Sequence, residues 1–201
     1  MKRFFLVILT LEACLFILSQ RPIFAQQPNL TSNQFITIVN PVRISAYSTN
    51  PKASLEAQYL EVKKRELVAT WLLTYDVISD SGAANAAAMM DKSQELGLFL
   101  EITPRFASES AVIYNKTDSW HRANSLFLSG YTQEERLQLI DLVFEKFKQI
   151  FGYYPSSVGA WWIDSYSLDY MKSKYNITAN LTVADQFATD GYRVWGQYWS
   201  T

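Results

Sequence analysis

Cysteine is almost absent from this chain of 201 residues, and its one copy, Cys14, lies in an apolar run near the N-terminus. The sequence after that run therefore offers no disulfide, no thiolate metal ligand and no cysteine nucleophile. Histidine is equally scarce, because His121 stands alone without a second histidine at the spacing of metal ligands. A single histidine of this kind is typical of a solvated loop. We therefore expect no metal site and no cofactor.

An excess of basic charge is also missing. The chain has 18 lysines and arginines against 19 aspartates and glutamates, without a basic stripe. Proteins that bind nucleic acids cluster lysine and arginine, so nucleic acid is not an expected partner. Aromatic residues, in contrast, are plentiful, with six Trp, twelve Tyr and twelve Phe. Such a content indicates a large aromatic core, or a surface that stacks on sugar rings.

Residues 1–25 have the three parts of a secretory signal peptide. Lys2 and Arg3 form a short basic start, an apolar run follows, and Ala25 supplies a small residue at the predicted cleavage site. The apolar run is shorter than the roughly 20 residues that a membrane-spanning helix needs. We predict a cleaved signal, a secreted or cell-envelope location and no membrane contact after cleavage. The alternative is an uncleaved N-terminal anchor.

A polar, flexible lead-in is predicted over residues 26–34, and strand-like and helix-like segments alternate after it. The apolar or β-branched runs that predict strands are 35–39, 68–75, 98–102, 157–163, 178–183 and 192–195. The amphipathic segments that predict helices are 50–65 (beginning at Asn50 or Ser54), 83–96 closed by Gly97, 133–151 behind a Thr132–Glu135 capping box, and 165–175 capped by Ser165. Residues 104–130 form a long loop, of the kind that often carries function.

Alternating strands and helices indicate parallel strands joined by right-handed crossovers. No glycine-rich phosphate loop follows the first predicted strand, which disfavours a doubly wound nucleotide-binding fold. We therefore predict an α/β domain of the (β/α) barrel type over residues 35–201. Five to six strands are visible, whereas a closed barrel usually has about eight. The chain stops at Thr201 within a strand-like or loop-like stretch, so we expect an incomplete barrel, truncated at its C-terminus.

Three acidic residues lie at the carboxyl ends of predicted strands, where parallel α/β folds collect their functional groups. They are Asp76, Glu101 and Asp164. Carboxylates that share a cleft raise one another's pKa, which lets one fold supply a general acid and a general base. A carboxylate pair beside exposed tryptophans is also the arrangement of a glycosidase. We therefore take these three residues as catalytic candidates, with Trp120 and Trp161 as candidate sugar-binding platforms.

Each candidate also has a structural interpretation. Asp164 directly precedes Ser165 and is well placed to cap the next helix. Glu101 could face solvent or pair with Arg105. Asp76 is the strongest candidate, because the next predicted helix begins several residues later and leaves it nothing to cap. Trp161, which belongs to a tryptophan pair on a strand, fits a core position as well as a platform.

Two segments resemble the polysaccharide deacetylase superfamily of (β/α) barrels. Thr74-Tyr75-Asp76 is similar to the start of the Thr-Phe-Asp-Asp-Gly motif of that family, and residues 151–171 resemble its later Gly-x-x-Pro segment. The resemblance spans roughly residues 68–179. It implies a barrel fold, a polysaccharide substrate and a hydrolytic activity in which Asp76 is the base.

The chain departs from the pattern of this family at the metal ligands. Val77 stands where the resemblance implies a metal-binding aspartate, and no His-x-x-x-His pair occurs. The Arg-Pro-Pro segment of the family is replaced by residues 161–164. The prediction is accordingly a secreted carbohydrate-active protein that acts on polysaccharide through strand-end carboxylates. The alternatives are a non-catalytic carbohydrate-binding protein on a degenerate enzyme fold and an envelope protein that serves only assembly.

Overall fold

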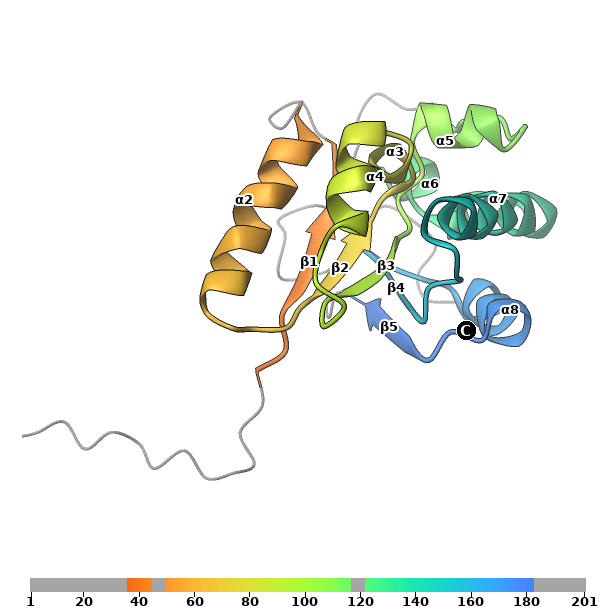
Figure 1. Ribbon diagram of the computed structural model, residues 1–201. Helices are drawn as coiled ribbons and strands as arrows, with labels where there is room; N and C mark the ends of the chain where they lie inside the picture. Colours follow the sequence, from red (N-terminus) through yellow and green to blue (C-terminus); the bar gives the residue numbers. More distant parts are fainter. Residues whose placement is uncertain (1–35, 45–49, 117–121, 183–201) are drawn as a thin grey trace, which may run out of the picture. The chain divides into compact units, whose positions relative to one another are not determined.

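The computed structural model describes residues 36–44, 50–116 and 122–182, which belong, from Thr37 onward, to one compact unit (Figure 1). The predicted signal peptide, the lead-in and the strand at 192–195 lie outside the described residues. So do Trp120 and His121.

Five parallel strands form one sheet in the part of the chain that the structure describes. They are β1 (Val39–Val42), β2 (Thr70–Leu73), β3 (Glu95–Phe99), β4 (Ser157–Ala160) and β5 (Ala179–Thr182). Each strand pairs in parallel with the next, and the spatial order is the chain order β1-β2-β3-β4-β5. A doubly wound sheet reverses its order at a switch point, whereas a (β/α) barrel advances one strand at a time in one direction. The fold is therefore an incomplete (β/α) barrel, as predicted.

Helices fill the connections between the strands (Figure 1). They are α2 (Pro51–Lys64), α3 (Tyr75–Ile78), α4 (Ser81–Ala88), α5 (Pro104–Glu109), α6 (Ala123–Leu126), the 3₁₀ helix η1 (Leu128–Gly130), α7 (Gln133–Phe151) and α8 (Ser165–Tyr175). The predicted capping box is present, since Thr132 and Glu135 each accept from the other's backbone N–H. Asn50 caps α2, and Gly152 ends α7 with a φ of 84°.

The sheet buries side chains on both of its faces. Trp71, Leu73 and Leu98 face the helices, in the main hydrophobic core with α7 and α8. Leu72 and Phe99 are also about 1% exposed, yet they lie outside that core, because alternate residues of a strand point to opposite faces. These two side chains belong to the inner face, which is the interior of a barrel.

Glycine makes room for Leu72 on this inner face. A β-carbon on Gly97 would lie 2.7 Å from Leu72 Cδ2 and 2.4 Å from Ser157 Oγ, and one on Gly159 would lie 2.5 Å from Leu72 Cδ1. No side chain larger than hydrogen fits at such distances. Strands β3 and β4 therefore have glycine, at Gly97 and Gly159, where the Leu72 side chain of β2 packs against their backbones.

Several predicted boundaries were wrong. The first strand lies at Val39–Val42 rather than 35–39 and contains Pro41, which is tolerated because β1 is an edge strand of the described sheet. The helix expected over 83–96 ends at Ala88, and Gly97 lies inside β3 instead of closing a helix. The loop expected over 104–130 contains α5, α6 and η1.

Within the three described ranges, no helix is both long enough and apolar enough to cross a membrane.

Candidate functional site

The inner face of the sheet ends in a polar layer at the carboxyl ends of the strands. Val42, Leu100 and Ala160 belong to the helix-facing core. The residues that follow them, Arg43 after β1, Glu101 after β3 and Trp161 after β4, therefore project to the inner side. The ends of three different strands thus bring the Arg43 guanidinium, the Glu101 carboxylate and the Trp161 indole together.

Glu101 is the centre of this layer and is 6% exposed. Its Oε1 accepts a hydrogen bond from Arg43 Nη2 at 2.8 Å, and its Oε2 accepts one from Trp161 Nε1 at 2.9 Å. Arg43 Nε also contacts Oε2, at 2.5 Å. The guanidinium lies over the Trp161 ring, 5.1 Å from its centroid. A buried carboxylate must be paired, and this one has both oxygens engaged.

Asp76 lies in the first turn of α3, directly after β2. The expectation that no helix begins near Asp76 was wrong, because Thr74 is the residue before α3 and the chain turns into this helix at once. The carboxylate is half-buried, and its Oδ1 accepts a hydrogen bond from Thr103 Oγ1 at 3.1 Å. Thr103 caps α5, two residues after Glu101. The β2 and β3 ends are therefore joined through Asp76.

The environment of Asp76 raises its pKa above the ordinary value of an aspartate. Burial is the main cause, and the negative charges of Glu101 and Glu109 act in the same direction. The hydrogen bond from Thr103 and the positive charge of Arg105 oppose the shift without cancelling it. Arg105 itself pairs with Glu109, at 2.7 Å, and not with Glu101. A carboxyl group of this kind gains and loses its proton closer to neutral pH.

Asp164 is also buried, but its contacts are those of a helix cap. Its Oδ1 accepts from the backbone N–H of Ser167 at 2.9 Å, and its Oδ2 accepts from the Ser167 hydroxyl at 2.8 Å. Arg136 on α7 completes the set with a 3.1 Å contact to Oδ1. Asp164 is the N-cap of α8, as its structural interpretation predicted, whereas Ser165, the other predicted cap, is the first residue of the helix. This carboxylate fastens the start of α8 to α7.

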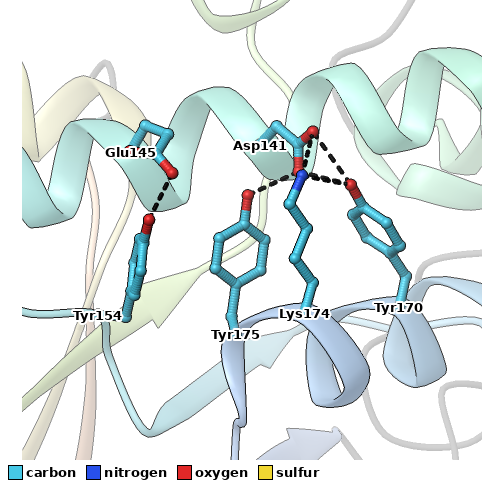
Figure 2. Close-up of polar contacts among 6 residues, drawn as sticks. All are labelled: Asp141, Glu145, Tyr154, Tyr170, Lys174 and Tyr175. Carbon is cyan, nitrogen blue, oxygen red and sulfur yellow. Dashed lines mark hydrogen bonds and ion pairs between the residues drawn. The ribbon is translucent and has the colours of Figure 1, made fainter.

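A second polar cluster joins the same two helices farther along (Figure 2). The Asp141 carboxylate of α7 accepts hydrogen bonds from Tyr170 at 2.8 Å, Lys174 at 2.8 Å and Tyr175 at 2.6 Å, all on α8. Burial acts to raise the pKa of Asp141, but these donors outweigh it and hold that pKa below its ordinary value. The cluster fixes α8, and hence the Asp164 turn, relative to α7.

The structure therefore separates the candidates. It brings Glu101 and Trp161 into direct contact and places Asp76 close enough for Glu101 to influence its pKa. Asp164 has different neighbours. Arg43 and Thr103 were not predicted as site residues. The alternation of side chains along β1 would have indicated Arg43, but the first strand was predicted at 35–39 instead of Val39–Val42.

The metal ligands of the deacetylase pattern have no counterpart in this layer. Val77, at the position of the metal-binding aspartate, is a fully buried core residue. No three histidine, cysteine, aspartate or glutamate side chains gather in a geometry suited to a metal ion within the described residues. The described residues of this layer do not fit a divalent metal.

Comparisons with known proteins leave the chain without an assigned family. No family profile matches it, and no curated protein matches its sequence. A search of solved structures finds a peptidoglycan N-acetylglucosamine deacetylase, crystallised with a benzamide compound, at 12% identity and a TM-score of 0.47. The match covers 72% of this chain and 55% of the deacetylase, so the chain spans about half the length of that protein. The assignment of the fold rests on the strand order of the chain itself.

Proposed function

We propose that the chain is an extracytoplasmic carbohydrate-active protein that hydrolyses polysaccharide at the carboxyl ends of its strands, with Asp76 as the general base. The observation that carries the proposal is the half-buried Asp76 carboxyl group at the carboxyl end of β2, whose pKa is raised by burial. An acid–base catalyst works best when its pKa lies near the working pH. The extracytoplasmic location rests on the signal-like residues 1–25.

The neighbouring groups have supporting roles in this proposal. Glu101 is held by Arg43 and Trp161, and its charge adds to the burial that raises the pKa of Asp76. In the reaction, Asp76 takes a proton from a water molecule as the oxygen of that water forms a bond to the reacting carbon of the substrate. The bond from that carbon to its leaving group then breaks, and the protonated Asp76 returns its proton to the leaving atom. Trp161 is half-buried and its N–H is engaged, so any contact with sugar is made through its exposed part.

The test is product release from a panel of chitin, cellulose and peptidoglycan, assayed for acetate and for new reducing ends. Asp76→Asn is expected to lower the rate at least a hundredfold, the lower range for a lost general base. Asp80→Asn is the matched control, since Asp80 caps α4 through a 2.8 Å contact and asparagine caps equally well. If both variants release product at the wild-type rate, Asp76 is not the base.

One observation favours a second candidate, a binding protein without turnover. Two of the three strand-end carboxylates, Glu101 and Asp164, are engaged in ion pairs with Arg43 and Arg136. A protein that only holds polysaccharide needs a rigid surface and no free acid. Retention of the wild-type chain on one of the three polysaccharides, with no product formed and no effect of Asp76→Asn, identifies this candidate.

A further inference from the structure

An open cavity of about 440 Å³ lies at the amino-terminal ends of the strands, beside the start of β3. Its walls are the C-terminal ends of α4 and α7 and the turn that leads into β3. Ala87 and Ala88 form the α4 wall, and their short side chains leave the space open. Ligand sites in proteins commonly have volumes of about 300–1,000 Å³ and mainly apolar linings.

Two aromatic rings of the α7 wall are held in place from behind. Phe147, which is fully buried, contacts the Phe151 ring at 4.5 Å and the Tyr153 ring at 5.5 Å between centroids. Gly152, between them, has a φ of 84°, and this left-handed turn lets both neighbours line the same cavity. Tyr153 nevertheless remains 48% exposed. The cavity thus has an aromatic wall of Phe151 and Tyr153 that packs against Phe147 and is partly open to solvent.

Polar groups complete the lining of the cavity. Asp91 and Lys92, both exposed, belong to the turn on the far side. The Asp91 carboxylate pairs with Lys63 at 3.1 Å, on the side of α2. The Tyr153 ring offers both an apolar face and a hydroxyl group. This mixture suits a ligand with an apolar face and polar edges better than a purely apolar one.

We propose that this cavity is a second carbohydrate-binding site, in which a pyranose ring stacks on Tyr153 and its hydroxyl groups bind Asp91 and Lys92. The inference rests on the proposed function for the class of ligand. It assigns the site to the amino-terminal ends of the strands, away from Asp76. A site so placed holds a polysaccharide without taking part in its hydrolysis.

The test is retention of the full chain on insoluble chitin, cellulose and peptidoglycan, measured as a binding isotherm for each. Tyr153→Ala is expected to weaken retention roughly three- to tenfold, the range for losing one aromatic contact. Tyr153→Phe keeps the ring and should retain most of the binding. Met89→Ala is the control, because Met89 is 85% exposed beside the cavity but does not line it. Product release from a short soluble oligosaccharide should stay at the wild-type rate in every variant.

A second variant keeps the test valid if Tyr153→Ala fails to fold. Ala88→Trp places a large side chain at an exposed position of the cavity wall and should block the site to a similar extent. Wild-type retention in both Tyr153→Ala and Ala88→Trp overturns the second site and leaves the role of Asp76 untouched. Loss of product in Asp76→Asn with unchanged retention is the converse result, and it supports two separate sites.

Discussion

Asp76 and Glu101 are two carboxylates at neighbouring strand ends with opposite environments. Glu101 has an arginine and an indole N–H on its oxygens, whereas Asp76 has one hydroxyl donor and a buried setting that raises its pKa. The same carboxyl chemistry therefore yields an ion-paired group at one position and a group with a raised pKa at the other. Both residues were correctly predicted to lie at strand ends, and Asp76 was ranked first. The partner of Glu101 was not predicted, because Arg43 lies 58 residues away in the sequence.

Removing Arg43 should destabilise the fold more than removing the whole ion pair. Arg43→Met leaves Glu101, 6% exposed, as an uncompensated buried charge, and we expect a loss of about 3 kcal/mol in the free energy of unfolding. The double variant Arg43→Met with Glu101→Gln should recover a large part of this loss. Urea denaturation of the wild type, both single variants and the double variant measures the coupling. Simple additivity of the two single effects would contradict the pairing.

Asp76→Asn should stabilise the folded protein at neutral pH while it abolishes activity. The pKa of Asp76 is higher in the folded than in the unfolded state, so ionisation as pH rises from about 4 favours the unfolded chain. Asparagine does not ionise and removes that penalty, which is absent below the ordinary pKa of aspartate. Thermal melts at pH 3 and pH 7 measure the difference. If Asp76→Asn has no more favourable effect on stability at pH 7 than at pH 3, the pKa of Asp76 is not raised.

Elements whose limits are set by local chemistry were predictable from sequence. The capping box of Thr132 and Glu135 and the left-handed Gly152 mark the two ends of α7, and Asn50, one of two predicted starts, caps α2. Elements limited by tertiary contacts were not. Gly97 was predicted to end a helix, but it lies in β3. The reason for glycine at this position is tertiary, because Leu72 and Ser157 leave no space for a β-carbon. The short helix α3 was missed because it has only four residues and no side-chain cap.

Gly97→Ala should therefore be far more harmful than its small size suggests. The added methyl group would lie 2.4 Å from Ser157 Oγ and 2.6 Å from the Ser157 carbonyl oxygen, so β3 and β4 must move apart. We expect a loss of about 2 kcal/mol, as for other overpacked cores. Gly82→Ala is the control, because its nearest contact is Asp80 Oδ1 at 3.2 Å, in a helix that favours alanine. Equal stability of the two variants in urea would argue against the close approach of β3 and β4.

At the scale of the whole molecule, the strand order places unlike groups at the two ends of one sheet. The carboxyl ends carry Arg43, Asp76, Glu101 and Trp161, while the cavity beside Tyr153 lies at the start of β3. Helices α7 and α8, joined through Asp141, connect the two ends along the outside. The chain order of the strands was predictable from the alternation of segments, but the pairing of groups across β1, β3 and β4 was not.

The central claim is that polysaccharide binds at the carboxyl ends of the strands, and the indole N–H of Trp161 reports on it directly. Its resonance in a ¹H–¹⁵N spectrum of the full chain, assigned with Trp161→Phe, is to be followed while chitohexaose, cellohexaose or a soluble muropeptide is added. The account predicts a saturable shift of this resonance with one of the three, because its hydrogen bond to Glu101 lies within the site. Binding of an oligosaccharide that moves other resonances and leaves Trp161 unchanged would contradict it.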